Sequence, residues 1–405
     1  MKTRSLTSYA SVGRALAVAL AVLFSAMIAQ AGERVILQFN PTQGYGSLSG
    51  LTSDSAGNLY GATSLGGSPS TYCGTAFELS PGSAGKWTET VLFEFQTCTY
   101  PGLSPIGAMV FDKQGNLYGV NLVGFNGGGE IFQLSKGTTG AWSYSVVHTF
   151  STVEGSPNGD LTWDSAGNLY GTTSFYQTTF DGEAFELSPQ PDGSWKETVL
   201  YTFPAPNGVG QPSAGVIFDS KGNLYGPASL GVGGSTGGVI YELSPQANGP
   251  WTLTVLYNGG NPTSRLTFDS TGNLYGTSNQ INGDVFELSQ TSAGKWTETI
   301  VHSFASGSDG SYPVGPLVID GSGSLYGTTT YGGVGCSQSL CGVVYKLTPQ
   351  GSGMWKETIV HPFESAGDGS QPQQGLFLDS AGNLFGTTYV GGSRYGYGAV
   401  YEITP

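Results

Sequence analysis

The sequence predicts an all-β protein: a seven-bladed β-propeller with four antiparallel strands in each blade. Three observations lead to this prediction. A short motif recurs seven times along the 405 residues, four apolar segments recur in the same order around each copy, and the two ends of the chain together supply one complete repeat. Only 10% of the residues are charged, against roughly a quarter in an average soluble domain.

The first segment of the chain has the features of an export signal. Three basic residues precede an apolar run at 15–29, and Ala-Gln-Ala at 29–31 offers small residues for cleavage. The run is shorter than the roughly 20 residues that a membrane span needs. We therefore expect residues 1–31 to be a signal peptide, residues 32–405 to form one propeller domain, and the protein to be extracellular, on the cell surface or in the periplasm.

The charge balance excludes some partners. The net charge is −14, and removing a signal peptide with three basic and no acidic residues would make it −17. Such a surface repels nucleic acid and anionic membranes. Extracellular glycans, cations and envelope proteins remain as partners, and the oligomeric state stays open.

The recurring motif consists of an Asp, two residues, a Gly, then Asn or Ser, Leu, Tyr or Phe, and Gly. The seven copies start at Asp54, Asp112, Asp164, Asp219, Asp269, Asp320 and Asp379. Their spacings of 50 to 59 residues are typical of propeller blades. The Asp can accept hydrogen bonds from nearby backbone amides and the Gly can supply a positive φ, so we interpret the motif as a strand-connecting turn. One carboxylate per loop is too few for an EF-hand type of calcium site.

Four strand-like segments accompany each motif. In the third repeat they are "GDLTWD" at 159–164, "NLYGTT" at 168–173, "EAFELSP" at 183–189 and "WKETVLYTF" at 195–203. Each is short, rich in β-branched and aromatic residues, and bounded by turn residues. Four such strands make one blade.

The chain ends predict how the ring closes. "ERVILQF" at 33–39 matches a fourth-strand segment, whereas "AVYEITP" at 399–405 matches a third-strand segment with no fourth strand after it. We therefore expect the first strand to complete the last blade, which would leave few exposed sheet edges. Six Trp start fourth strands, which favours a packing role: Trp87, Trp142, Trp195, Trp251, Trp296 and Trp355.

The order of these segments resembles a known family. "DSTGNLYGTS", "GDVFELS" and "KWTETIVHSF" are similar to the GloVer tandem repeats of exported bacterial proteins known as choice-of-anchor proteins, and the likeness covers about residues 33–405. The resemblance implies a secreted or surface protein with no established activity. Many members carry a C-terminal surface anchor, and this chain stops at Pro405 directly after a strand.

Two common motifs are missing from the sequence. It contains no Walker loop and no Cys-x-x-Cys, so we expect no cofactor. His148, His302 and His361 share one position in the fourth strand of different repeats. We expect each His to sit alone, in packing or at the surface, and we expect no metal site.

The four Cys residues suit an oxidising compartment. Cys336 and Cys341 lie in one loop, whereas Cys73 precedes a third strand and Cys98 follows the neighbouring fourth strand. We predict the disulfides Cys336–Cys341 and Cys73–Cys98, although four Cys allow three connectivities.

Variable loops on one face provide the candidate binding residues. Loops joining second to third strands and fourth to next first strands emerge on the same side of a propeller, and binding residues commonly lie on such loops. Aromatic rings there could stack on sugars, or could merely hold Gly-rich loops in place. The candidates are Phe125, Phe175, Tyr176, Phe180, Tyr331, Tyr389, Arg394, Tyr395 and Tyr397.

Three acidic residues near the start of third strands are the weak catalytic candidates. Glu130, Glu183 and Asp284 replace the Thr, Val or Ala of other repeats. They could face a common centre and bind a cation or act as an acid and a base, which in a glycosidase requires carboxyls about 5 to 9.5 Å apart. Solvated strand ends are the alternative explanation.

The sequence thus favours an exported, non-catalytic binding or surface-interaction propeller, one that recognises glycans or another extracellular polymer through its loop face. The alternative is a secreted carbohydrate-active hydrolase or lyase that uses carboxylates near the central channel. A structural envelope protein is the third hypothesis.

Overall fold

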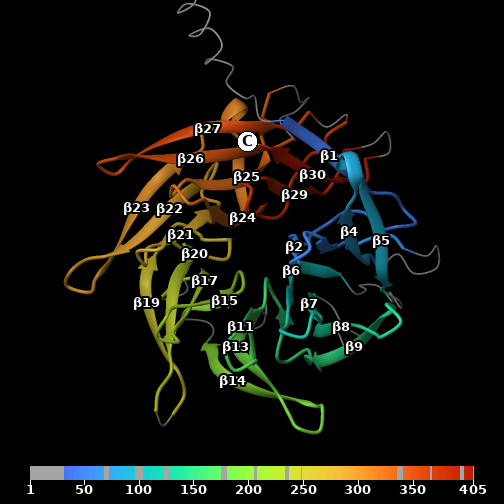
Figure 1. Cartoon of the computed structure of the whole chain (residues 1–405). Helices are drawn as coiled ribbons and strands as arrows, with labels where there is room; N and C mark the ends of the chain where they lie inside the picture. Colours follow the sequence, from blue (N-terminus) through green and yellow to red (C-terminus); the bar gives the residue numbers. More distant parts are fainter. Residues whose placement is uncertain are drawn as a thin grey trace, which may run out of the picture.

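Seven antiparallel sheets are arranged in a ring around a common centre, in the order in which they follow along the chain (Figure 1). The structure, a computed structural model, describes residues 32–67, 73–95, 104–122, 128–174, 180–204, 208–232, 237–247, 249–334, 341–364, 367–392 and 396–404. Within these residues the predicted seven-bladed propeller is confirmed. The described part of the chain contains no helix that is long and apolar enough to cross a membrane.

Each of the first four blades is built from consecutive strands, which follow one another from the centre outward. Blade 1 contains β2 (Thr52–Ser53), β3 (Leu59–Ala62), β4 (Thr75–Pro81) and β5 (Trp87–Glu94). Blade 2 contains β6 (Pro105–Phe111), β7 (Leu117–Asn121), β8 (Glu130–Lys136) and β9 (Trp142–Thr149). Blade 3 contains β10 (Ser156–Pro157) and β11 (Thr162–Trp163) innermost, then β12 (Leu169–Ser174), β13 (Phe180–Pro189) and β14 (Trp195–Pro204). Blade 4 contains β15 (Gly210–Pro212) and β16 (Ile217–Phe218), then β17 (Leu224–Leu230), β18 (Val239–Ser244) and β19 (Thr252–Asn258).

The remaining three blades follow the same order. Blade 5 contains β20 (Thr267–Phe268), β21 (Leu274–Ser278), β22 (Asp284–Gln290) and β23 (Trp296–Ser303). Blade 6 contains β24 (Ser311–Ile319), β25 (Leu325–Tyr331), β26 (Val343–Gly351) and β27 (Met354–Pro362). Blade 7 contains β28 (Phe377–Leu378), β29 (Leu384–Thr388), β30 (Ala399–Thr404) and β1 (Gly32–Gln38). Two single-turn 3-10 segments, η1 (Ser83–Gly85) and η2 (Gly307–Asp309), lie in connections.

The ring closes as the chain ends predict. Strand β1 pairs antiparallel with β30, with Glu33 opposite Ile403 and Val35 opposite Tyr401. Phe39 follows β1, is buried, and contacts the ring of Phe77 in blade 1 at a centroid distance of 5.6 Å. The N-terminal strand therefore completes blade 7 and also helps to join it to blade 1.

The recurring motif forms the predicted turn. In blade 1 the Asp54 carboxylate accepts hydrogen bonds from the backbone amides of Ala56 and Asn58 and from the Tyr60 hydroxyl, and Gly57 has a φ of 84°. The other six copies anchor their Asp on nearby amides in a similar way. The motif thus satisfies the backbone of a tight reversal that every blade needs.

The hydrophobic core is divided into seven layers, each between two neighbouring blades. One large ring on each third strand is fully buried, as Phe185 is in blade 3. The ring covers the Gly of the second strand: a Cβ added at Gly171 would lie 2.6 Å from the Phe185 ring. This close approach explains why every motif ends in Gly.

The Trp residues pack between blades, as predicted. Trp195 at the start of β14 meets Tyr118 of blade 2 at 5.8 Å, and Trp355 meets Tyr275 of blade 5 at 6.1 Å. These edge-to-face contacts join each outer strand to the second strand of the preceding blade, and such geometry stabilises an aromatic pair beyond its buried area.

Candidate functional site

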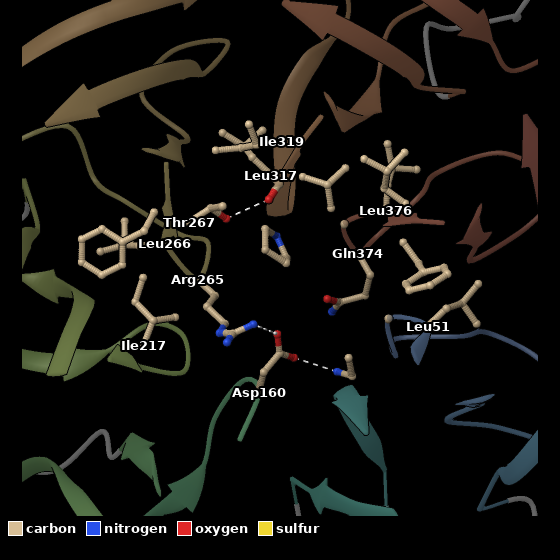
Figure 2. A pocket seen from close by; sticks show the side chains of 18 residues that line it. Leu51, Asp160, Ile217, Arg265, Leu266, Thr267, Leu317, Ile319, Gln374 and Leu376 are labelled. Atoms are coloured by element: carbon tan, nitrogen blue, oxygen red, sulfur yellow. Dashed lines mark hydrogen bonds and ion pairs between the residues drawn. The ribbon is translucent and has the colours of Figure 1, made fainter. Parts of the chain in front are cut away.

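The innermost strands enclose a cavity along the central channel of the ring. It has a volume of about 570 Å³ and is lined by the innermost strands of all seven blades (Figure 2). Most of its wall is apolar, with Leu51, Ile217, Leu266, Leu317 and Leu376 among the lining residues. The volume lies within the range of about 300 to 1,000 Å³ that is usual for small-molecule sites.

Two charged residues interrupt this wall at one repeat position. Four residues before the repeat Asp, five blades carry small residues or Pro: Gly50, Ala108, Gly215, Pro316 and Gly375. Blade 3 instead carries Asp160 and blade 5 carries Arg265. The Asp160 Oδ2 lies 3.8 Å from the Arg265 Nη1 (Figure 2).

The local backbone fixes both side chains. Asp160 lies in the break between β10 and β11, and its Oδ1 accepts a hydrogen bond of 2.7 Å from the backbone amide of Ala108. Arg265 precedes β20, and its Nη2 reaches Thr162 Oγ1 at 3.5 Å. The Asp160 side chain is 8% exposed and that of Arg265 is 32% exposed. The carboxylate is therefore held rigidly, whereas the guanidinium remains partly accessible.

The pair stands between the channel and a smaller polar cavity, which we call the channel mouth. The mouth has a volume of about 150 Å³ and is lined by Asp160, Ser213, Ala214, Thr263, Ser264, Arg265, Val314, Gly315, Pro316, Gln373 and Gln374. Several of these residues precede the paired part of an innermost strand, on the side where the fourth-to-first-strand connections emerge. The mouth therefore opens toward the face predicted to bind.

Polar groups at the mouth differ in how accessible they are. Among the described residues, the Nε of Arg265 and the Oγ1 of Thr263 are buried and make no hydrogen bond. The Gln374 amide points into the channel (Figure 2) and donates to the Leu48 carbonyl at 3.0 Å. Because the Arg265 Nε and Thr263 Oγ1 are enclosed by protein, a ligand at the mouth could reach only the exposed part of the Arg265 side chain, which is 32% exposed.

The mouth can bind hydroxyl groups but offers little for acid–base catalysis. Asp160 is the one carboxylate among the described residues that line the channel and its mouth. A glycosidase that uses two carboxyls needs a second one about 5 to 9.5 Å away. Neither Asp160 nor Arg265 was among the site residues predicted from the sequence, and the signal that would have found them is their departure from the small residues of the other repeats.

The predicted acidic set does not converge on the channel. The Glu130 carboxylate is buried and accepts hydrogen bonds from Asn121 and Tyr144 within blade 2. Glu183 accepts a bond of 3.4 Å from Thr202, and Asp284 accepts one of 3.3 Å from Ser278. Each residue contacts its own blade, because a third strand is separated from the channel by two others.

The described loop aromatics contact other parts of the chain. Tyr331 meets Tyr312 at 5.4 Å, and Tyr397 meets Tyr45 at 5.1 Å. The Tyr389 ring covers Gly46, and Phe180 pairs with Pro204 in the sheet of blade 3. The remaining candidates lie outside the described residues: Phe125, Phe175, Tyr176, Arg394 and Tyr395. Sugar stacking by this set stays a prediction.

Each of the three His lies on the outer strand of a different blade, and each lies near a carboxylate. Nε2 of His148 lies 3.4 Å from Glu197, Nε2 of His302 lies 3.4 Å from Asp309, and Nε2 of His361 lies 3.0 Å from Asp368. The repeat pattern does not predict these contacts. Glu197 lies on the next blade, and Asp309 and Asp368 lie in connections between strands.

Both described Cys residues are buried, and neither is a free thiol. Their predicted partners, Cys98 and Cys336, lie outside the described residues. The pairing of Cys73 with Cys98 and of Cys336 with Cys341 therefore stays a prediction.

The repeat sequence and the fold both have relatives. The sequence profile of the Gloeobacter/Verrucomicrobia repeat matches the chain twice, over residues 9–208 and 190–401. A search of curated proteins found no match.

Among solved structures, the extracellular domain of BT4673 from B. thetaiotaomicron, described as a hybrid two component system, superposes with a TM-score of 0.58 at 14% identity. The match covers 92% of this chain and 42% of that one. A protein of Bacteroides fragilis NCTC 9343 described as a 6-phosphogluconolactonase gives 0.51 at 14% identity, covering 78% of this chain and 85% of that one. At such identities the likeness concerns the fold alone.

Proposed function

Because the chain belongs to the Gloeobacter/Verrucomicrobia repeat family, whose repeats in this protein form one closed ring, we propose that it is an exported, non-catalytic binding propeller. Its ligand is a neutral, hydroxyl-rich molecule such as the end of an extracellular glycan. The binding site is the channel mouth around Asp160 and Arg265. The observation that carries the proposal is the pairing of a fixed Asp160 carboxylate with a partly exposed Arg265 guanidinium in a channel whose wall is mostly apolar.

The chemistry of a sugar fits these two groups. Neighbouring hydroxyls of a sugar both donate and accept hydrogen bonds, and bonds to charged groups are stronger than neutral ones. Asp160 can accept a hydrogen bond from one hydroxyl, and the partly exposed Arg265 guanidinium can donate one to another. A ligand that pairs with both groups gains specificity, because an analogue that lacks one hydroxyl loses that bond.

The charge of the protein supports a neutral ligand. The chain carries a net charge of −14, so a polyanionic polymer would be repelled at long range. The positive charge of Arg265 is already balanced by Asp160. A neutral glycan is not repelled by the net charge, and it does not require an unbalanced positive charge at Arg265.

Binding is favoured over hydrolysis because a single carboxylate lines the described channel and mouth. The alternative, a carbohydrate-active hydrolase or lyase, would need a second acid or base supplied by the loops or by the substrate. The neighbour described as a 6-phosphogluconolactonase shares the fold only, and propellers host unrelated functions.

Export and display belong to the same proposal. Residues 1–31 have the composition of a signal peptide and lie outside the described residues. The ligand would then be met outside the cytoplasm, on the cell surface or in the periplasm. An envelope protein that occupies the same mouth is the competing partner.

A glycan and polysaccharide array on the purified chain, with and without calcium, tests the proposal, and each hit should be followed by an assay for products. We expect binding without turnover, and at least a tenfold loss of affinity in Arg265→Gln and in Asp160→Asn. Asp160→Asn is informative because the Asn Oδ1 can still accept from the Ala108 amide. Lys356→Gln, an exposed change on β27, is the matched control.

Three results would reject parts of the proposal. Turnover of a bound glycan would establish the hydrolase or lyase. Binding that survives both channel variants would move the site to the loop aromatics. No binding to any glycan would leave an envelope protein as the partner.

A further inference from the structure

Outer strands of neighbouring blades meet through one recurring pair of positions. The first position lies two residues before the Phe that ends the fourth-strand segment. The second lies on the next outer strand, two residues after its first Trp, or at the matching Glu33 of β1, which has no Trp. All three His of the chain occupy the first position, and each faces a Glu at the second: His148 with Glu197, His302 with Glu357 and His361 with Glu33. Between blades 1 and 2 the first position is Phe93 and the second is Tyr144, and their rings stack at a centroid distance of 4.7 Å.

A second carboxylate lies near each of these pairs, and two of the resulting trios are compact. Asp309 of η2 reaches the His302 Nε2 at 3.4 Å, and Glu357 of β27 reaches it at 3.5 Å. Glu154 lies near His148 and Glu197, and in each of these two trios one ligand atom per residue lies within 4.8 Å of the others. Each trio therefore brings one imidazole nitrogen and two carboxylate oxygens around a single point.

A backbone amide holds each loop carboxylate, Glu154 or Asp309, by a hydrogen bond. The amide three residues after the His donates to the carboxylate, from Ser151 to Glu154 and from Ala305 to Asp309. Each imidazole also packs edge-on against the Phe two residues later, at 4.6 Å for His148 and 4.7 Å for His302. Such supporting contacts orient metal ligands in known sites.

Buried polar atoms in both trios make no hydrogen bond among the described residues. They are the Nε2 atoms of His148 and His302, and one carboxylate oxygen of Glu197 and of Glu357. The third His differs, because His361 Nε2 makes a hydrogen bond of 3.0 Å with Asp368. In the first two trios the imidazole and the carboxylates therefore lie close together without bonding directly.

Three of the distances between ligand atoms suit a tetrahedral ion. Zinc binds His nitrogen and carboxylate oxygen at about 2.0 to 2.2 Å, so two ligand atoms of a tetrahedral site lie roughly 3.3 to 3.5 Å apart. The distances from Nε2 to the carboxylate oxygens are 3.4 Å to Glu197, 3.4 Å to Asp309 and 3.5 Å to Glu357. Calcium fits poorly, because it takes six to eight oxygen ligands.

We propose that His148–Glu154–Glu197 and His302–Asp309–Glu357 are two binding sites for a divalent transition metal of the zinc type. Each site uses three protein ligands and leaves one position for water. The first links blade 2 to blade 3 and the second links blade 5 to blade 6. The proposal is independent of ligand binding at the channel mouth.

The charges of both trios suit a bound cation, because each trio combines two carboxylates with one imidazole. Because the ligands must be deprotonated to bind, zinc affinity should fall as the pH is lowered.

Zinc titration of the chelator-treated chain, prepared without a histidine tag, tests the proposal. By calorimetry and metal analysis we expect two zinc ions per chain, one in His148→Gln, one in His302→Gln and none in the double variant. His361→Gln is the matched control and should still bind two. Circular dichroism and thermal unfolding confirm that each variant is folded.

A measurement on the unchanged chain guards against variants that fail to fold. In NMR spectra of histidine-labelled protein, zinc should shift the ring signals of two of the three His and leave the third unchanged. Unchanged spectra with no bound zinc at micromolar concentration would overturn the proposal. It would also be overturned if the double variant bound as much zinc as the parent, or if only His361 responded.

Discussion

The carboxylate of Asp160 in blade 3 and the guanidinium of Arg265 in blade 5 face each other at the channel, with 3.8 Å between Oδ2 and Nη1, although blade 4 stands between their blades. The pair joins two segments that share no strand pairing. The pair also interrupts the pattern of small residues or Pro that the other five blades share at this position.

Removing Arg265 should destabilise the propeller. In Arg265→Gln the 8% exposed Asp160 carboxylate loses its cation, and we expect a loss of about 1 to 3 kcal/mol, the usual cost of a buried charged group left unpaired. The combined variant Asp160→Asn/Arg265→Gln should cost less than the sum of the single changes, because the two groups interact. Urea unfolding measures all three, and strict additivity would show that the pair does not interact.

Gly215 must stay without a side chain. A Cβ there would lie 2.0 Å from the Asp160 carbonyl oxygen, so Gly215→Ala should force blades 3 and 4 apart at the channel. We expect a cost of about 1 to 3 kcal/mol, typical of overpacking. Gly321→Ala, where a Cβ meets nothing within 4 Å, is the matched control. Equal unfolding midpoints for the two variants would contradict the expected clash.

Glu89 should make the protein less stable above neutral pH. Both of its carboxylate oxygens are buried without a partner, and burial raises its pKa to about 7, against about 4.3 in an unfolded chain. Its contribution to stability is present below about pH 4.3 and is lost as the pH rises through 7. Glu89→Gln should therefore stabilise at pH 8 by about 1 to 2 kcal/mol, after allowance for partial exposure, and should change little at pH 4. The exposed Glu364→Gln should be neutral at both pH values; the same result for Glu89→Gln would refute the prediction.

The turn carboxylates should produce the opposite pH dependence in acid. Burial alone would raise the pKa of Asp320, but hydrogen bonds from Ser322 and Ser324 lower it to about 2. Its stabilising contribution is complete above about pH 3.9, the unfolded value, and is lost as the pH falls toward 2. We expect the urea midpoint to drop between pH 4 and pH 2, and to drop less in Asp320→Asn. An identical acid slope for parent and variant would exclude this turn as a cause.

The closure of the ring should be essential for stability. Phe39 is 2% exposed and contacts Phe77 across the junction of blades 7 and 1, so Phe39→Ala should cost about 3 to 5 kcal/mol. Deleting residues 33–39 should be more severe, because β30 would lose its outer partner. Val199→Ala, at a position that is 46% exposed, should stay within about 0.5 kcal/mol. A deletion variant that melts like the parent would disprove closure through β1.

The sequence by itself determined the parts of this protein that repeat. Each blade is specified by local patterns, such as the hydrogen bonds of Asp54 to its own turn and the Gly171–Phe185 contact between paired strands. A pattern written seven times predicts the same local structure seven times, and the unmatched end segments predict the partner of β1. These features depend on residues near in sequence or at matched repeat positions, so they can be read without coordinates.

Only the tertiary structure decided which of the residues that differ between repeats contact one another. Asp160 and Arg265 come together because the ring brings non-adjacent blades to one channel and because the break between β10 and β11 places Asp160 there. His302 meets Glu357 because outer strands of adjacent blades pack face to face, and Asp309 reaches them from a connecting loop. Periodicity describes what the blades share, whereas contacts between their differing residues depend on the geometry of the closed ring.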